Sequence, residues 1–131
     1  MRAERLLHRG RRLAESLHTD TFTVYRPTGE MVQDPDTWTE VPELATILTD
    51  VKGKLQSGAT QTREAQTPGV KVAETSLIWH TSVDTVGVLT DDVIECTASI
   101  DPELVGERVR VTGDFLKSLA TARRYPVEHA S

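Results

Sequence analysis

Apolar side chains recur at intervals of three and four over the first 18 residues, a spacing that gathers them on one face of an α-helix. Arg2, Arg5, Arg9 and Arg12 fall on the other side. A short helix with a narrow apolar face gains most of its stability from packing. We therefore predict an amphipathic helix over 1–18 that packs on its own domain or on a neighbouring subunit. Its apolar stripe comprises Ala3, Leu6, Leu7, Gly10, Leu13, Ala14 and Leu17.

From residue 19 onward the apolar positions alternate with a period of two, which is typical of strands with one buried face. The alternation starts at 21–26. After it, RPTGE is predicted to turn the chain, and QDPDTWTE to form a hairpin loop or a short extension. A long strand is predicted over 44–55, with Val51 and Lys52 on opposite faces.

Four more strands are predicted, which brings the total to about six. Several short strands behind one helix favour a mainly β fold. We therefore predict two parts, the helix over 1–18 and a small six-stranded β-barrel or sandwich over 19–131. The further strands are expected at 70–83, 91–99, 107–115 and 121–128.

The segment between the two long strands, QSGATQTREAQTPG, has few apolar residues and no convincing period. Structureless stretches of this length are uncommon inside compact domains and are usually functional or disordered. We therefore predict one long flexible loop over 56–69 and regard it as a candidate functional element. Its residues are Gln56, Ser57, Gly58, Ala59, Thr60, Gln61, Thr62, Arg63, Glu64, Ala65, Gln66, Thr67, Pro68 and Gly69.

The net charge of −5 is unevenly distributed along the chain. Residues 1–12 hold five basic side chains and one acidic side chain. Residues 13–106 hold five basic and sixteen acidic side chains, and residues 107–131 hold five basic and three acidic ones. A basic segment, an acidic segment and a second basic segment in this order do not favour one broad surface that binds phosphate groups. No apolar run is long enough to span a membrane, and the basic N-terminus lacks the apolar core of a signal peptide. A cytosolic protein without membrane contact is therefore expected.

Reactive side chains are few and scattered. Cys96 is the one cysteine, and its acidic neighbours raise the pKa of a thiol rather than activate it, so a buried structural role is expected. His8, His18, His80 and His129 show no metal-ligand spacing within one element. The segment DPDTWTE begins like a calcium loop but lacks its glycine and final glutamate, and no phosphate-binding glycine loop occurs. We therefore predict no catalytic residue, no cofactor, no metal site and no enzyme activity.

Arg123 and Arg124 stand side by side in the last predicted strand. Neighbours in a strand point to opposite faces, so the two cannot form one flat phosphate site. We expect one of them to pair with an acidic residue of its own barrel and the other to face a neighbouring subunit or solvent. The six aromatic residues are thinly spread, which disfavours base stacking. A small nucleic-acid-binding barrel, like the oligonucleotide-binding fold, remains the alternative function.

Several motifs follow one another in a distinctive order. An arginine-rich segment leads into TDTFTVYRPTGE and DPDT, and LTDDVIECTAS, DPELVGERVRVTG and KSLATARRYPVE come later. In this order they resemble the head-to-tail stopper proteins, also called head-closure or neck proteins, of long-tailed phages, particularly phages and prophages of actinobacteria. The resemblance covers nearly the whole chain, and its most specific parts are 101–113 and 118–128.

The resemblance implies a structural virion protein of the phage head–tail connector, without catalytic activity or cofactor. Such subunits form a homo-oligomeric ring below the portal and its adaptor, close the DNA channel after packaging, and offer the surface for tail attachment. The implied partners are further copies of the chain, the adaptor, and the tail terminator or other tail proteins. Packaged double-stranded DNA passes through without specific binding. The implied location is the neck of the virion, after assembly in the cytoplasm of the host bacterium.

The resemblance also suggests roles for particular residues. The segment 56–69 matches the loop that projects into the channel and acts as the plug. The acidic central span, if it lines the channel, would repel DNA and let it slide, while the basic helix would serve as an assembly arm toward an acidic neighbour. A ring needs two different surfaces on each subunit. The residues expected at subunit or partner interfaces are Arg2, Arg5, Leu6, Arg9, Arg12, Leu13, Arg123 and Arg124.

Overall fold

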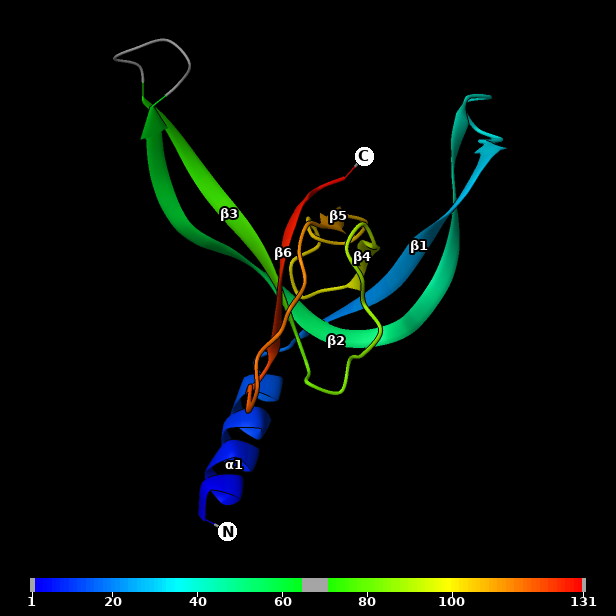
Figure 1. The fold of residues 1–131 in the computed structure, drawn as a ribbon. Coiled ribbons are helices and arrows are strands. Elements are labelled where there is room, and N and C mark those ends of the chain that lie inside the picture. The colour runs from blue at the N-terminus through cyan, green and yellow to red at the C-terminus, as the bar shows by residue number, and fades with distance from the viewer. Residues whose placement is uncertain (1, 65–70, 131) are drawn as a thin grey trace.

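The computed structural model describes residues 2–64 and 71–130, which form one helix followed by six strands. The strands close into an antiparallel barrel in the order β1-β2-β3-β6-β5-β4 (Figure 1). The predicted mainly β fold with a leading helix is therefore confirmed. The elements are α1 (Arg2–Ser16), β1 (Asp20–Gln33), β2 (Glu40–Glu64), β3 (Lys71–Thr81), β4 (Val93–Ala98), β5 (Arg108–Val111) and β6 (Arg123–His129).

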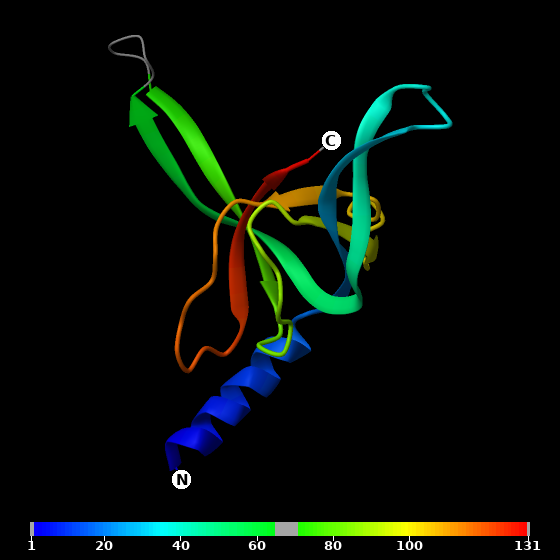
Figure 2. The ribbon, with the colours of Figure 1, turned by 45° about the vertical axis from the view of Figure 1, so that its right-hand side comes forward.

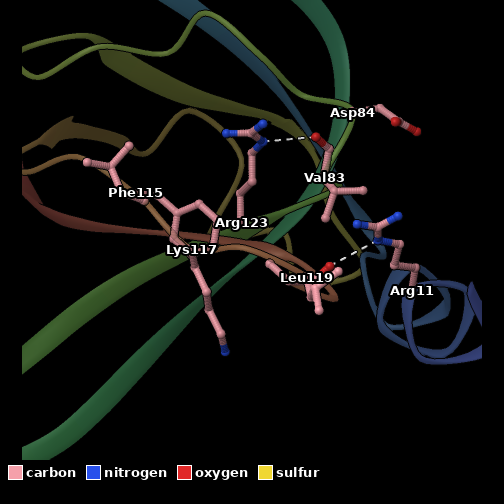
Figure 3. A pocket seen from close by; sticks show the side chains of 9 residues that line it. Arg11, Val83, Asp84, Phe115, Lys117, Leu119 and Arg123 are labelled. Atoms are coloured by element: carbon pink, nitrogen blue, oxygen red, sulfur yellow. Dashed lines mark hydrogen bonds between the residues drawn. The ribbon is translucent and has the colours of Figure 1, made fainter. Parts of the chain in front are cut away.

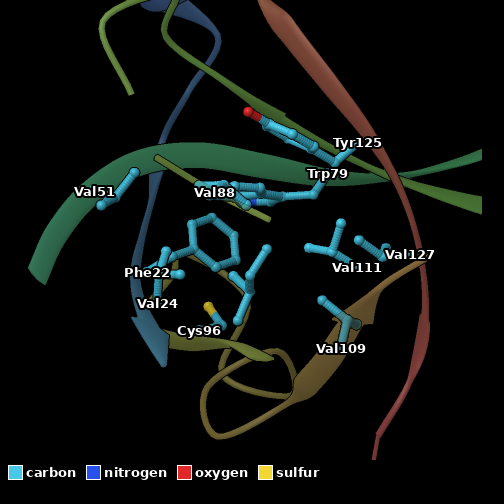
Figure 4. Close-up of a cluster of buried hydrophobic side chains, with 11 residues drawn as sticks. Phe22, Val24, Val51, Trp79, Val88, Cys96, Val109, Val111, Tyr125 and Val127 are labelled. Carbon is cyan, nitrogen blue, oxygen red and sulfur yellow. The ribbon is translucent and has the colours of Figure 1, made fainter. Parts of the chain in front are cut away.

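Aromatic side chains fill the centre of the barrel (Figure 4). Trp79 stacks on Tyr125 at a centroid distance of 5.8 Å and meets the Phe22 ring edge to face at 5.7 Å. Valines from β1, β2, β5 and β6 surround the rings, as the period-two alternation predicts. Edge-to-face and offset ring pairs stabilise a core beyond the area that they bury.

Gly53 lies at the point where the long strand β2 changes partner. It pairs with Asp20 of β1 and with Thr81 of β3, so one strand belongs to two hairpins. A Cβ atom at this position would sit 2.4 Å from the carbonyl oxygen of His80 and 3.0 Å from Nε1 of Trp79. Glycine in a strand often marks a tight corner of a barrel or a close backbone approach. The absence of a side chain here lets β2 bend against the core.

The β1–β2 hairpin is longer than predicted, because RPTGE continues the strand instead of turning the chain. Pro27 pairs with Leu44, and pairing resumes at Met31 after a register shift. Gly29 lies within this irregularity and has a φ of 90°. The extra residues and the left-handed glycine form a bulge that bends the strand without ending it. The turn itself lies at 34–39, the position expected for the QDPDTWTE loop.

The prediction of a loop over 56–69 is wrong for its first nine residues. Residues 56–64 continue β2 and pair with β3 in a second long hairpin, for example Gln56 with Ile78 and Ser57 with Leu77. Residues 65–69 lie outside the described residues. Backbone hydrogen bonds between two strands need no apolar side chains, so a polar segment with no period can still form a ladder.

The other predicted elements hold with shifted ends. The strand expected at 70–83 ends at Thr81, and its residue 70 lies outside the described residues; the strand expected at 91–99 is shorter at both ends, and the strand expected at 107–115 ends at Val111. The last strand starts and ends slightly later than predicted, at Arg123 and His129. The helix ends at Ser16 rather than at residue 18, and it does not meet the length and hydropathy needed to cross a membrane.

Helix α1 extends away from the barrel and touches it near the loop before β6 (Figures 1 and 2). A Cβ atom at Gly10 would lie 2.9 Å from the methyl group of Thr121, so glycine permits this close packing. Arg11 donates a hydrogen bond through Nε to the carbonyl of Ala120 at 3.0 Å. Only part of the predicted apolar stripe is covered, because Leu6 and Leu13 remain 57% and 67% exposed.

Candidate functional site

The outer face of α1 combines basic and apolar side chains in contact with solvent. Its arginines and leucines from the predicted interface are all exposed, and Leu17 at the end of the stripe is exposed as well. A surface that presents both leucines and guanidinium groups suits contact with an acidic and apolar partner. The exposed residues that the sequence analysis assigns to this surface are Arg2, Arg5, Leu6, Arg9, Arg12 and Leu13.

Arg123 and Arg124 point to different sides of β6, as strand alternation predicts. Arg123 is half-buried and donates from Nε to the carbonyl of Val83 at 2.9 Å, and its guanidinium lies 6.0 Å from the centre of the Phe115 ring. It therefore binds a backbone carbonyl rather than the expected carboxylate. Arg124 is exposed on the other face and pairs in register with His80.

Arg123 also lines a cavity of about 410 Å³ between the barrel and α1 (Figure 3). Arg11 enters from the helix, and Phe115 and Leu119 come from the loop before β6. Both arginines already donate to backbone carbonyls across this space. Through one N–H group each, they consequently fasten the loops of the barrel to one another and to the helix.

A row of basic side chains crosses three neighbouring strands on the outside of the barrel. Lys54 of β2 pairs in register with His80 of β3, which pairs with Arg124 of β6. The next register row contains Trp79 and Tyr125, which point into the core, so Lys54, His80 and Arg124 share the outer face. We call these three residues the basic row. Directly opposed Cβ atoms in a sheet are about 5 Å apart, so the three groups are close neighbours.

The basic row has no partner of opposite charge among residues 2–64 and 71–130. No hydrogen bond or ion pair joins Lys54, His80 or Arg124 to another side chain in this part of the protein. Burial lowers the pKa of His80 to about 4, with further lowering by the positive charges of Lys54 and Arg124 and by His18. His80 is therefore neutral near pH 7 and stands between two basic side chains.

His18, just after α1, adds an unused polar group beside the row. Its side chain is only 6% exposed, and its Nδ1 atom has no hydrogen-bond partner. Burial lowers the pKa of His18, the charge of Lys54 lowers it further, and Glu15 raises it. The Glu15 carboxylate itself accepts a hydrogen bond from Ser82 Oγ at 3.0 Å. Buried polar groups are normally satisfied, so an orphaned nitrogen here is unusual.

An acidic surface lies on the outer part of the β1–β2 hairpin. Residues 27–43 contain five carboxylates and no basic side chain, and none of the carboxylates forms an ion pair with another described residue. We call this segment the acidic arm. Trp38 near its tip is 74% exposed, and Met31 is 54% exposed. The carboxylates are those of Glu30, Asp34, Asp36, Glu40 and Glu43.

Sequence reasoning missed both the acidic arm and the basic row as surfaces. A count of charges within 27–43 would have found the arm, because it needs only the local sequence. The basic row joins positions 54, 80 and 124, which only the strand register brings together. The structure thus adds Lys54 and His80 to the predicted interface residue Arg124.

Acidic side chains near Cys96 serve the structure of the barrel. Asp92 is 1% exposed and accepts hydrogen bonds from Nε and Nη2 of Arg26, at 2.9 and 3.0 Å, and from the backbone of Leu89 at 2.8 Å. Glu95 accepts from Arg108 at 2.7 Å. Burial raises the pKa of the Cys96 thiol, and the charge of Asp20 raises it further. A buried thiol held in its neutral form is a poor nucleophile.

A second cavity, of about 520 Å³, lies at the base of the acidic arm. Its walls include apolar side chains from the first two strands together with Arg108 and Arg110 of β5. Arg108 binds Glu95, and Arg110 binds the carboxylates of Asp91 and Glu128. The positive charges in this cavity are therefore already neutralised within the barrel.

The remaining candidates for chemistry are dispersed. In the parts of the chain that the structure describes, no group of three His, Cys, Asp or Glu side chains is placed to hold a metal ion. His8 and His129 are exposed at separate places. Asp34, considered as a calcium ligand, accepts a hydrogen bond from the backbone of Asp36 at 2.9 Å and shapes the turn of the arm.

Comparison with known proteins gives one family. Residues 10–128 match the family DUF6093, a family of unknown function. The match covers most of the chain, so the protein belongs to this family. No curated protein and no solved structure matches the chain.

Proposed function

We propose that this DUF6093 protein is a structural subunit of a phage head–tail connector. In this role it forms a ring that closes the DNA channel after packaging, completes the head and provides the surface for tail attachment. The observation that carries the proposal is the pair of long hairpins projecting from a small barrel (Figure 1). The order of the stopper-like motifs along the sequence supports the same role.

The projecting hairpins have open edges that favour assembly. In the described residues, β1 pairs with β4 only over Thr21–Tyr25, and β3 pairs with β6 only over Leu77–Thr81. The outer parts of both hairpins are therefore two-stranded ribbons. An isolated two-stranded ribbon is marginally stable in water, and its free edges readily take up further contacts. In a ring, neighbouring subunits and partner proteins would cover these edges.

The β2–β3 hairpin is the proposed plug. Its outer part contains residues 56–64 of the segment that the resemblance assigns to this role, and strand pairing carries these residues well beyond the barrel. In a ring, hairpins from all subunits would converge toward the axis and obstruct the channel. The excess of acidic over basic side chains in 13–106 favours a surface that repels duplex DNA and lets it pass.

The proposal assigns the remaining partners to the two ends of the ring. The adaptor of the portal complex would bind on the head side, and the tail terminator or other tail proteins on the tail side. Helix α1 is the proposed assembly arm, because Leu6 and Leu13 are exposed beside its arginines. The mature protein would reside in the neck of the virion, after assembly in the cytoplasm of the host.

A nucleic-acid-binding barrel is the alternative, and the unpaired basic row favours it. However, base stacking needs exposed aromatic rings beside the cations. Phe22, Trp79 and Tyr125 are buried in the core, and the exposed Trp38 lies in the acidic arm. These positions leave the basic row without a stacking platform, so the connector is the better supported function.

Native mass spectrometry and electron microscopy of the purified protein separate the two functions. The connector predicts rings, either with the protein alone or after addition of a portal–adaptor complex. The alternative predicts a monomer that does not bind this complex and that binds single-stranded DNA with an affinity that falls steeply with salt concentration. The latter result would refute the connector.

A hairpin truncation tests the plug. Thr60 and Thr75 are register partners, so replacement of residues 60–75 by a short Asn-Gly turn preserves the pairing below them. We expect normal folding and heads that package DNA but lose it. The matched control replaces only 64–71 and retains the strand pairs from Arg63 and Val72 inward. Truncated subunits that give full, stable heads would exclude the plug assignment.

A further inference from the structure

The basic row has the properties of a receptor for carboxylates. Lys54 and Arg124 flank a neutral His80, and none of the three forms an ion pair within the described residues. Beside them, the buried Nδ1 of His18 has no partner. The neighbouring carboxylate of Glu15 is bound to Ser82. A cluster of cations without counter-charge gains free energy when a carboxylate approaches.

The acidic arm has the complementary properties. It carries five carboxylates and no cation, and its exposed Met31 and Trp38 supply apolar area for a contact. A tight turn at 34–39 holds its end in shape, with Trp38 N donating to the carbonyl of Asp34 at 2.7 Å. Exposed aromatic residues beside charged ones are typical anchors of protein interfaces.

The two surfaces belong to different parts of the molecule. The basic row lies on β2, β3 and β6 of the barrel, whereas the acidic arm is the outer end of β1 and the start of β2. The β1–β2 hairpin projects away from α1 and from the barrel in both ribbon views (Figures 1 and 2). The arm of one copy is thus available to a second copy.

We propose that the acidic arm of one copy docks on the basic row of the next copy, in a contact that repeats from subunit to subunit. The contact joins two different surfaces, so it is heterologous and generates a ring or an open chain. The inference deepens the proposed connector function and rests on it for the closure of the ring. The arm-to-row contact itself is measured with the isolated protein.

The contact brings arm carboxylates to His80 and His18. At present Lys54 and Arg124 face His80 from both neighbouring strands, and Glu15 on α1 faces His18. A docked carboxylate favours the charged imidazole, so docking raises the pKa of His80. Histidine NMR signals therefore report occupation of the row separately from any change in mass.

Two charge-reversed variants test the contact. The row variant carries Lys54→Glu and Arg124→Glu, and the arm variant carries Asp36→Lys and Glu40→Lys. Sedimentation velocity is measured for the wild type, for each variant and for their mixture, in low and high salt. We expect the wild type to form larger species that dissociate in high salt, because exposed charge contacts are screened. Each variant alone is expected to be monomeric.

The mixture gives a distinctive result. The arm variant retains a native row and the row variant retains a native arm, so one native contact can form between them. The reversed row and the reversed arm at the two outer ends also carry opposite charges, so the mixture is expected to form a one-to-one dimer at least and to associate further through the swapped charges. The control variant carries Lys117→Glu and Glu103→Lys, which alter exposed charges outside both surfaces, and it is expected to behave as the wild type.

The outcomes separate this contact from the connector function. A wild type that stays monomeric in low salt at the highest soluble concentration overturns the arm-to-row contact, as does a mixture without heterodimer. If both variants still form wild-type rings, the contact is overturned and the connector stands. If none of the proteins assembles with a portal–adaptor complex, the connector fails. Loss of duplex-DNA binding by the row variant, with unchanged self-association, assigns the row to nucleic acid and also overturns the contact.

Discussion

Substitution of Gly53 by alanine tests how the barrel accommodates the change of partner along β2. The new Cβ atom would lie 2.4 Å from the carbonyl oxygen of His80, a backbone atom that moves only if β3 moves. It would also lie 3.0 Å from Nε1 of Trp79 and 3.4 Å from the ring of Phe22. Real contacts of this type require about 3.5 Å or more, so the strands must separate or the rings must shift.

The expected loss of stability follows from two opposing effects. Overpacking of a well-packed core costs up to about 3 kcal/mol when backbone has to move. Alanine also lowers the conformational entropy of the unfolded chain, which stabilises the native protein by about 0.4–1 kcal/mol. The free energy of unfolding should therefore fall by about 2 kcal/mol, a large part of the roughly 5–15 kcal/mol that stabilises a domain.

Urea unfolding followed by tryptophan fluorescence measures this change, with the transition midpoint compared at an unchanged m-value. Gly113→Ala is the matched control, because its Cβ atom would meet a ring carbon of Pro126 at 3.1 Å, and a proline ring can shift by a small change of pucker. We expect the control to stay within about 0.5 kcal/mol of the wild type. A Gly53→Ala protein as stable as this control would refute the account of the β2 corner.

Three further predictions concern titratable and reactive groups. The fold lowers the pKa of His80 to about 4. Between pH 6.5 and 4 the unfolded chain therefore binds a proton at His80 that the native protein does not bind. The free energy of unfolding should decrease as the pH falls from about 6.5 toward 4. Unfolding in urea at several pH values, with His80→Gln as comparison, should show a weaker pH dependence in the variant; an equal dependence would remove His80 as the cause. Asp92→Asn should lower the transition midpoint, because it weakens the buried hydrogen bonds to Arg26 and Leu89, whereas Asp84→Asn, at an exposed site, should not. Cys96 should react with a thiol reagent only in denaturant, and labelling of the native protein at the rate of free cysteine would contradict its burial.

Local periodicity was sufficient to predict the helix, the mainly β fold and the approximate positions of most strands. Side-chain direction in a helix or strand repeats with the backbone, so spacing alone puts Val51 and Lys52 on opposite faces and separates Arg123 from Arg124. The same reasoning failed where apolar and polar residues do not alternate or where turn-forming residues occur inside a strand. Residues 56–64 lack alternation but still pair with β3 through their backbone, and RPTGE contains turn-forming residues but forms a bulge.

Of the candidate surfaces, some are visible in the sequence and one depends on the tertiary structure. The charge of the acidic arm is a property of consecutive residues, and the arginines of α1 are visible in the first turns of the chain. The basic row depends on the registers of β2 with β3 and of β3 with β6, which join positions 54, 80 and 124. Register is set by the packing of the whole core, because a slip by one residue would turn every buried side chain outward.

The sequence by itself determined most of the elements, the alternation of their faces and the uneven distribution of charge, because each of these follows from neighbouring residues. Only the tertiary structure decided that one strand serves two hairpins, that Arg123 binds a carbonyl rather than a carboxylate, and that Lys54, His80 and Arg124 form one surface. These features depend on contacts between residues far apart in the chain, and closure of the barrel is what brings such residues together.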